Sequence, residues 1–409
     1  MRFLLVVPPL AGHVAPLRGV AAELTARGHA VAWCGAEPGV SRLVGAGPAV
    51  AAVPAVQAVP AVPAGPGRPG SPPEPAAPVW AAGDSAPFEV GLRPPGLRGF
   101  AALKHLWEQY LVPLAEAMVP GVAQAVAEFG PDVVVADQQA FAGALVAART
   151  GVPWATSAST SAELGDPLAV LPKIASWADG LQDGLRRRHG VESGDLRFSP
   201  RLVLAFTTRA LAGPPAAKAG PAVRYVGPVP AAAPPWPFPW SRLDGRPLVL
   251  VTLGTANAPA GRRFLRESAV ALSALPGVQG LVVDPGGTVA VEGILTRARI
   301  PQTEVLRNAA AVVCHGGHNT VCETLSAGLP LVVAPIRDDQ SILAGQVVDA
   351  GAGLRLRFDR ATAADLAVAV RTVLDRPRYR AAARGIAESF RAAGGAGPAA
   401  DRLEALGGR

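Results

Sequence analysis

The sequence predicts an α/β protein made of two Rossmann-like, doubly wound domains that face each other across a cleft. The chain opens with a strand over Arg2–Val7, a helix over Val14–Arg27 and a second strand from Ala30, which together make a βαβ unit. A second α/β series begins at Leu248, after a proline-rich stretch over residues 227–247 that has no helix or strand periodicity. With 409 residues the chain is long enough for two ordinary domains.

Composition and periodicity together divide the chain into four parts. Residues 1–226 are expected to form the N-terminal Rossmann-like domain, and residues 227–247 a linker. Residues 248–390 are expected to form the C-terminal Rossmann-like domain, and residues 391–409 a helical tail.

Apolar runs predict the strands of both halves, and helical spacing predicts the segments between them. The expected strands are Asp132–Ala136, Pro153–Ser157, Leu202–Thr207, Leu248–Thr252, Gly280–Val283, Ala311–Cys314 and Leu331–Ala334. The expected helices are Ala140–Arg149, Arg263–Ala274, Val321–Ala327, 362–376, 378–393 and about 399–406. Residues 97–129 are predicted as helices broken at Pro113 and Pro120. Residues 48–96 are predicted as an extended loop around one strand, and residues 158–190 as loop.

The composition excludes several classes of function. The net charge of +7 comes mainly from scattered arginines, and no aromatic interleaving accompanies it, so we predict no nucleic-acid partner. The three cysteines lack metal-ligand spacing, which argues against a disulfide framework or a zinc site. The apolar start Phe3–Val7 is too short for a signal peptide and is predicted as a buried strand. We predict no membrane span and a cytoplasmic location.

The segment around residues 311–328 predicts a phosphate-binding turn. A short buried strand ends at Cys314, the residues His315, Gly316 and Gly317 follow, and a helix then runs to Gly328. The glycines let the backbone approach a ligand, while the first amides of the helix have no partner within it. Free N–H groups and the positive end of the helix dipole favour an anion such as phosphate.

Polar side chains beyond this turn match the remaining parts of a nucleotide sugar. Glu323 lies four residues after Asn319 on one helix face, where a carboxylate can accept hydrogen bonds from ribose hydroxyls. Asp339 and Gln340 follow the next strand at its carboxyl end, and an acid beside an amide suits a polyol such as a hexose. Together these features indicate a nucleotide-diphosphate sugar as co-substrate, with no separate cofactor.

This segment resembles the donor-binding signature of family 1 inverting glycosyltransferases, whose GT-B fold has two facing Rossmann-like domains. Plant members carry WAPQ, HCGWNS, a Glu and D/E-Q; the matching residues here are Pro301, Gln302, His315, Gly317, Asn319, Thr320, Glu323, Asp339 and Gln340. The resemblance implies that His315 and the backbone at Gly316, Gly317, His318, Asn319 and Thr320 hold the diphosphate. It further implies that Glu323 holds the ribose, and Asp339 with Gln340 the sugar.

Two other features bear on the donor. The plant tryptophan that stacks on uracil falls at Arg299, so base recognition must come from that arginine or from the backbone at Ile300, and uridine and thymidine both stay open. The turn Gly254-Thr255 resembles the family's turn that donates to the β-phosphate.

The predicted catalytic pair is His13 with Asp137. His13 follows the first strand, just before the expected helix, and Asp137 follows the strand Asp132–Ala136, so both lie at one edge of the sheet. A histidine can take a hydroxyl proton near neutral pH, and a carboxylate on its other nitrogen orients it. The pattern Gly12-His13 with Pro16 also resembles the family's base motif.

The sequence therefore predicts an inverting glycosyltransferase that acts without a metal, since no Asp-x-Asp motif is present. The N-terminal domain would bind the acceptor and the C-terminal domain the donor, a dTDP- or UDP-sugar. The resemblance implies a hydrophobic small-molecule acceptor, such as a polyketide or other secondary metabolite, and leaves a homodimer possible. Two alternatives stay open at this point: a nucleotide-sugar epimerase of the same fold, and a non-catalytic protein that binds sugar nucleotides.

Overall fold

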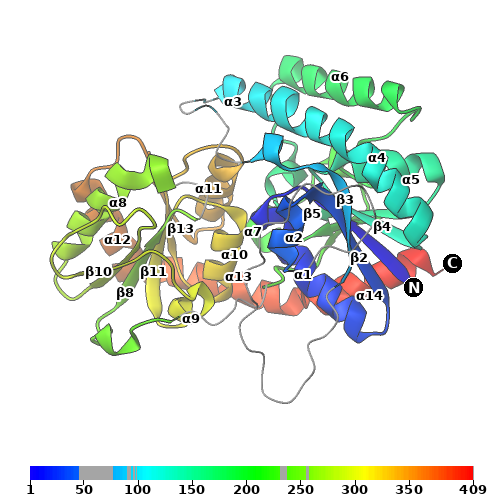
Figure 1. Ribbon diagram of the computed structural model, residues 1–409. Coiled ribbons are helices and arrows are strands. Elements are labelled where there is room, and N and C mark those ends of the chain that lie inside the picture. Colours follow the sequence, from blue (N-terminus) through cyan, green and yellow to red (C-terminus); the bar gives the residue numbers. More distant parts are fainter. Residues whose placement is uncertain are drawn as a thin grey trace.

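The computed structural model describes residues 1–45, 77–89, 94, 97, 99–230, 237–254 and 258–408. Within these residues the chain forms two parallel sheets, each flanked by helices, which lie side by side (Figure 1). The predicted fold class is confirmed. Most of the predicted loop at 48–96 and part of the proline-rich stretch at 227–247 lie outside the described residues.

The N-terminal half is built on a sheet with the strand order β3-β2-β1-β4-β5-β6-β7, in which all neighbours are parallel. Its strands are β1 (Arg2–Val6), β2 (Ala30–Glu37), β3 (Val79–Asp84), β4 (Val133–Asp137), β5 (Trp154–Ala158), β6 (Val203–Ala205) and β7 (Val223–Tyr225). Its helices are α1 (Ala11–Ala26), α2 (Gly39–Val44), η1 (Ala86–Phe88), α3 (Gly99–His105), η3 (Leu106–Leu111), α4 (Val112–Phe129), α5 (Phe141–Thr150), η4 (Ala162–Gly165), α6 (Pro172–Arg188), α7 (Arg209–Ala212) and η5 (Ala217–Ala219).

The C-terminal half repeats this design with the strand order β10-β9-β8-β11-β12-β13. Its strands are β8 (Leu248–Thr252), β9 (Gln279–Val283), β10 (Ile294–Arg297), β11 (Ala309–Cys314), β12 (Leu331–Val333) and β13 (Gly353–Arg355). Its helices are η6 (Trp240–Arg242), α8 (Ala258–Ser273), α9 (Gln302–Arg307), α10 (His318–Ser326), α11 (Gln340–Asp349), α12 (Ala363–Asp375), α13 (Pro377–Ala393) and α14 (Ala396–Gly407).

Both sheets are buried on two faces, which explains why their strands read as continuous apolar runs. In β1, Phe3 and Leu5 join the core on one face of the sheet, while Leu4 and Val6 join the core on the other. The strand β8 divides its side chains between two cores in the same way. Alternation of this kind follows from the two-residue period of a strand and is typical of parallel sheets between helix layers.

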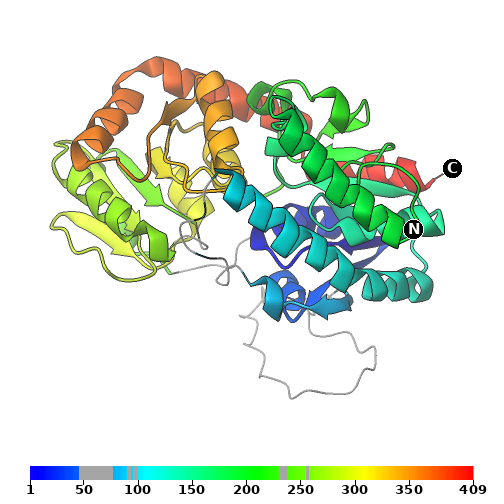
Figure 2. The ribbon, with the colours of Figure 1, turned by 90° about the horizontal axis from the view of Figure 1, so that it is seen from above.

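The last helix crosses back to the N-terminal half. The Gly395 N–H donates to the Val226 carbonyl at 2.7 Å, and α14 then packs along α1. Leu403 and Leu406 of α14 are part of the core beneath the first sheet. Both chain ends accordingly lie close together at the outer end of that half (Figures 1 and 2).

Two sequence predictions about helix boundaries are wrong. The helix α1 begins at Ala11, because the N–H groups of His13 and Val14 already bond to the Leu10 carbonyl, so His13 lies in its first turn. The helix α4 is not broken by proline: Pro113 occupies its first turn, where no N–H is needed, and Pro120 lies within it. The buried face of α4, which includes Met118, supplies packing that offsets the missing hydrogen bond at Pro120.

Residues 158–190 are not all loop, as the sequence had indicated, since α6 covers 172–188. Its buried positions Ala178, Gln182 and Leu185 have helical spacing, but one of them is polar, so the apolar pattern was weak. The short strands β7, β10 and β13 were also missed. Three or four residues are too few for a periodic signal.

One helical stretch, Gly99–Phe129, is long and apolar enough to cross a membrane by length and composition alone. Its α4 portion places Leu114, Met118 and Val122 in the core on the face of the first sheet that Leu4 and Val6 line, opposite the face covered by α14. The burial of these side chains within the protein accounts for the apolar character of the stretch.

Candidate active site

The predicted site residues gather where the strand order of each sheet reverses. In the first sheet the reversal falls between β1 and β4, and His13 and Asp137 lie at the carboxyl ends of these two strands. In the second sheet it falls between β8 and β11, which lead to Gly254 and His315. Ligands of doubly wound sheets bind at such reversal points, because the two flanking loops diverge there and leave a crevice.

His13 and Asp137 are in direct contact. The His13 Nδ1 lies 2.8 Å from the Asp137 Oδ1, and the carboxylate is fully buried while the imidazole is partly exposed. The Gln139 N–H also donates to the same carboxylate oxygen at 2.9 Å, which fixes its orientation. Among the described residues none bonds to the His13 Nε2, so this nitrogen is available to a substrate.

The electrostatic setting of His13 suits a proton acceptor. Burial by itself would lower the pKa of His13, but the charge and hydrogen bond of Asp137 outweigh it and raise that pKa above its usual value. The carboxylate of Asp339, from the other half, acts in the same direction. The imidazolium formed on proton uptake is therefore stabilised by a carboxylate from each half.

Three further residues near Asp137 were missed by the sequence reasoning. The Ser159 hydroxyl lies 2.8 Å from the His13 Nδ1. The Tyr110 hydroxyl and both polar side-chain atoms of Gln138 are buried without a hydrogen-bond partner among the described residues. Burial and the charge of Asp137 both raise the pKa of Tyr110, so its hydroxyl stays protonated. Ser159 and Gln138 had only their position after a strand as a sequence signal, which they share with many loop residues, and Tyr110 lies within a helical segment.

The start of α10 has the predicted form. Gly317 is the extended residue before the helix and no side chain caps it, so the first N–H groups of this nine-residue helix are open to a ligand. The glycines also make room for His315. A side chain at Gly317 would come within 2.4 Å of the His315 Nε2, and one at Gly254 within 3.0 Å of its Cε1. The His315 ring is thus held between two backbone segments.

His315 is a neutral side chain at neutral pH. Burial lowers the pKa of His315 to about 4, and the nearby Arg337 guanidinium acts in the same direction. Its Nδ1 is buried without a hydrogen-bond partner among the described residues. A neutral imidazole beside open helix amides can donate one N–H to an anion.

The predicted ribose and base residues meet on the next elements. The Gln302 Nε2, at the start of α9, donates to the Glu323 Oε2 of α10 at 2.6 Å. Burial raises the pKa of Glu323, and the hydrogen bond from Gln302 opposes the shift. Ile300, two residues before Gln302, is partly buried against the core of the C-terminal half. The other carboxylate oxygen of Glu323 is not bonded to Gln302, and this oxygen can accept hydrogen bonds from a ligand.

The predicted sugar residues lie at the start of α11. Asp339 accepts a hydrogen bond from the Thr160 hydroxyl at 2.6 Å. Burial raises the pKa of Asp339, and this hydrogen bond opposes the shift. The Gln340 Oε1 accepts from the N–H groups of Ile336 and Arg337, which leaves its amide nitrogen as the group able to reach a ligand.

The start of α10 also contacts the N-terminal half directly. The Asn319 Nδ2 donates to the Gly12 carbonyl at 3.3 Å, one residue before His13. The His318 imidazole lies 3.1 Å from the Phe206 carbonyl through Nε2, and its Nδ1 lies 3.4 Å from the Ser161 N–H. The side chain of His318 therefore joins the two halves, while its backbone begins the helix.

For two predicted site residues, Thr255 and Thr320, the described part of the structure shows no side-chain contact with the rest of the site. Thr255 lies outside the described residues. Thr320 is buried in the first turn of α10, where its carbonyl accepts from the Thr324 hydroxyl at 2.7 Å. Within the described part of the chain, no group of three or more His, Cys, Asp or Glu side chains is placed to hold a metal ion.

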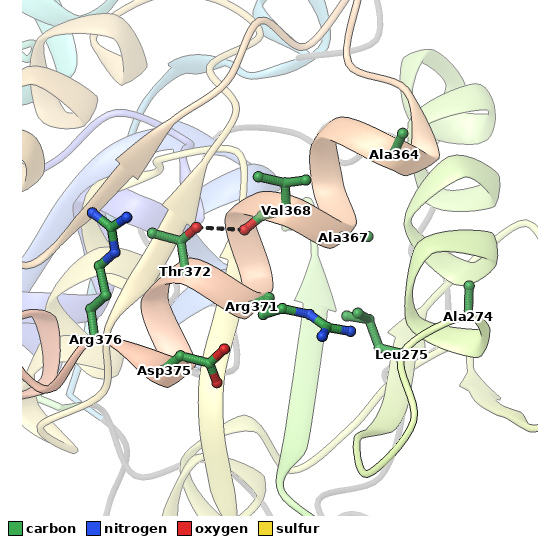
Figure 3. Close-up of a pocket in the computed structure, with 9 residues that line it drawn as sticks. All are labelled: Ala274, Leu275, Ala364, Ala367, Val368, Arg371, Thr372, Asp375 and Arg376. Carbon is green, nitrogen blue, oxygen red and sulfur yellow. Dashed lines mark hydrogen bonds between the residues drawn. The ribbon is translucent and has the colours of Figure 1, made fainter.

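A surface cavity elsewhere is distinct from this site. It has a volume of about 530 Å³ and lies between the end of α8, at Ala274 and Leu275, and the outer face of α12, where Val368 and Arg371 line it (Figure 3). None of the predicted site residues borders it. A smaller cavity beside α3 is lined in part by His105.

The chain is similar in sequence to known proteins. The chain is 29% identical over 446 aligned residues to 4'-demethylrebeccamycin synthase of Lentzea aerocolonigenes, and the alignment covers 99% of both chains. Residues 287–406 match the family described as Erythromycin biosynthesis protein CIII-like, C-terminal domain.

Solved structures share the whole fold. CalG4, the calicheamicin glycosyltransferase, matches with a TM-score of 0.76 at 23% identity, covering 100% of this chain and 99% of that one. The glycosyltransferase VinC, solved in complex with DTDP, matches with a TM-score of 0.73 at 18% identity, covering 100% of this chain and 99% of that one.

The two sheets, their facing reversal points and these matches define a protein of the GT-B class. The chain is a glycosyltransferase, and its residues 287–406 are similar to the Erythromycin biosynthesis protein CIII-like C-terminal domain. The predicted enzyme class is confirmed.

Proposed function

We propose that the protein transfers a sugar from a dTDP- or UDP-sugar to a hydroxyl group of a hydrophobic natural product, with inversion at the anomeric carbon and without a metal ion. In this proposal residues 1–226 bind the acceptor, and residues 248–390 bind the donor. One observation carries it: Asn319, at the open start of α10, touches the carbonyl of Gly12, the residue before His13. This contact supports the proposal because it brings the start of α10 next to the residue that precedes His13.

The donor half offers a partner for each part of a nucleotide sugar. The amides at the start of α10 and the neutral His315 suit the diphosphate, Glu323 the ribose, and Asp339 with Gln340 the hexose. Thymidine is the first base to test, because the structurally similar VinC was solved with DTDP.

The acceptor half offers a polar group set in apolar surroundings. The Tyr110 hydroxyl is buried without a partner, and its ring packs edge-on against Phe88 at 5.8 Å between centroids. Tyr110 belongs to η3, a π-helical segment, and such segments are frequent at functional sites. An aromatic acceptor with a few hydroxyls would match this combination.

The proposed step follows from these positions. The His13 Nε2 takes the proton from the acceptor hydroxyl, and Asp137 stabilises the imidazolium. The acceptor oxygen forms a bond to the anomeric carbon while the bond from that carbon to the diphosphate breaks on the opposite face. The diphosphate departs with the electron pair, and the amides of α10 and the His315 N–H stabilise its charge.

The first test separates chemistry from donor binding. We expect His13→Ala to lower kcat by about 10²–10⁴, the usual contribution of a general base, and to leave the Kd for thymidine diphosphate within about twofold. Calorimetry gives the Kd, and product formation from dTDP- or UDP-hexoses gives kcat. NMR of the product's anomeric proton reports inversion, and activity in excess EDTA reports metal independence.

A matched control is His189→Ala, which removes a histidine paired with Glu116 at the far end of α6. We expect it to retain wild-type turnover. Equal turnover in His13→Ala and wild type would rule out the proposed base, and retention at the anomeric carbon would rule out the proposed displacement.

A further inference from the structure

Three consecutive hydroxyl residues lie between the proposed base and the proposed sugar subsite. Ser159, Thr160 and Ser161 follow β5 and precede η4 in the N-terminal half. All three are buried, with exposed fractions of 3%, 5% and 0%. A buried hydroxyl costs free energy unless it finds a partner, so the contacts of this triplet need an explanation.

Each hydroxyl of the triplet has a different partner. The Ser159 hydroxyl lies 2.8 Å from the His13 Nδ1, on the side away from the free Nε2. The Thr160 hydroxyl donates to the Asp339 Oδ2 of the other half at 2.6 Å. The Ser161 hydroxyl donates to the Gln346 Oε1 of α11 at 2.6 Å, so the triplet is bound to the helix that begins beside Asp339.

We propose that Thr160 is a positioning residue that holds the Asp339 carboxylate toward the donor sugar at a set distance from His13. The inference rests on the proposed function, and it assigns to this hydroxyl a role in the reaction that the sequence did not indicate. Because Ser159 and Thr160 are adjacent, one short backbone segment determines where both the imidazole and the carboxylate lie. Donor binding and base placement are thereby linked across the two halves.

The surroundings of Asp339 explain why its carboxylate needs this hydroxyl. The group is partly buried, and burial raises its pKa, while the Thr160 hydrogen bond favours the ionised form. The charges of His13 and Asp339 also act on each other. An ionised Asp339 accepts hydrogen bonds from sugar hydroxyls and supports the imidazolium at His13.

The test is Thr160→Val, which keeps the side-chain shape and removes the hydroxyl. We expect the KM for the dTDP- or UDP-hexose that the wild type uses best to rise about tenfold to a hundredfold, since a hydrogen bond to a charged group is lost. The Kd for the corresponding nucleoside diphosphate, measured by calorimetry, should stay within about twofold, because it carries no sugar. Thr160→Ser, which restores a hydroxyl, should return the KM to within about threefold of the wild type.

Thr208→Val is the matched control. The Thr208 hydroxyl lies 2.7 Å from the Ser389 hydroxyl of α13, so this variant also removes a hydroxyl contact between the halves, but at a different place. It should keep the wild-type KM. Thermal unfolding of each variant checks that the fold is intact.

The possible results separate the two proposals. A higher KM in Thr160→Val alone, with the nucleoside diphosphate Kd unchanged, supports the positioning role. The role is overturned if Thr160→Val behaves like Thr208→Val, if the nucleoside diphosphate Kd weakens as much as the KM, or if Thr160→Ser fails to recover. If the wild type neither binds nucleoside diphosphates nor transfers sugar, the proposed function itself fails and this inference with it.

Discussion

At the scale of single residues, the site consists of polar groups whose charge states are set by burial and by one or two neighbours. Asp137 is buried and fixed by the Gln139 N–H, so its charge acts on His13 with little screening by water. No carboxylate raises the pKa of His315 or of His318, and burial lowers the pKa of both, so both imidazoles are neutral at neutral pH. Histidines in one cleft can thus carry out opposite tasks, one accepting a proton and the others donating neutral hydrogen bonds.

The Asp137→Asn variant tests this division of tasks. Because Asp137 raises the pKa of His13, its loss should move the acidic limb of the kcat/KM profile to lower pH. The rate at the plateau should fall by about 10²–10⁴, since the imidazolium loses its counter-charge and its orientation. The measurement is kcat/KM between pH 4 and 9; an acidic limb that stays in place would contradict the assignment.

At the scale of elements, a proline inside α1 allows one hydrogen bond between the two halves, from Asn319 to Gly12. Proline at position 16 has no N–H, so the usual bond from residue 16 to the Gly12 carbonyl, four residues earlier, cannot form. The Gly12 carbonyl instead accepts the Asn319 amide of α10 at 3.3 Å. The Gly-His-x-x-Pro spacing therefore does more than place a histidine after a strand, because it also leaves an acceptor open one residue before it.

The Pro16→Ala variant tests the role of this open carbonyl. A new N–H at position 16 would compete with Asn319 for the Gly12 carbonyl. We expect kcat/KM to fall several-fold while the thermal midpoint stays the same or rises, since alanine suits a helix interior better than proline. A double-mutant cycle with Asn319→Ala should show strong non-additivity. Additive effects on kcat/KM would mean that Pro16 acts by another route.

At the scale of the whole molecule, the two halves are joined by the returning α14 and by buried contacts at the cleft. Leu403 of α14 completes the core under the first sheet. At the cleft, His318 spans from α10 to the Phe206 carbonyl and the Ser161 N–H, and it is 8% exposed. The stability of these contacts between the two halves should therefore depend on the charge of His318.

Acid should weaken the folded state through His315 and His318. Burial lowers the pKa of each to about 4, below the usual value near 6.5. Between pH 6.5 and 4 the unfolded chain therefore binds more protons at these sites, so stability is full above this window and falls as the pH drops through it. Protonation at each site lowers the free energy of unfolding by roughly 3 kcal/mol as the pH falls through this window.

The His318→Gln variant isolates this effect. It removes one titrating group, so the loss of thermal midpoint between pH 7 and 4.5 should be smaller than in the wild type. The variant is compared with His105→Gln, a histidine removal outside the cleft contacts. A pH dependence identical to that of the wild type would show that His318 does not stay neutral in the fold.

Much of this architecture could be predicted from local sequence. The apolar runs of β1, β4, β8 and β11 are long enough to be unambiguous, and the glycine turn before α10 has a specific chemistry. The order of strands then places His13, Asp137 and His315 at reversal points. The positions of Glu323 on the helix after the glycine turn and of Asp339 after β12 also follow from the order of residues along the chain.

Other features depend on contacts between distant parts of the chain. The triplet Ser159–Ser161 carried no readable pattern, because a hydroxyl in a loop is ordinary until its partner is known. Its partners His13, Asp339 and Gln346 lie 146, 179 and 185 residues away. The course of α4 through Pro120 was likewise decided by packing against the sheet, which outweighed the local preference to break.

The sequence by itself determined which chemical groups exist and to which strand end each belongs, because strand, turn and helix preferences act over a few residues. Only the tertiary structure decided which groups from the two halves meet. Hydrogen bonds such as those of Thr160 with Asp339 and of Asn319 with Gly12 form only when the two sheets come together, and no local pattern encodes that distance.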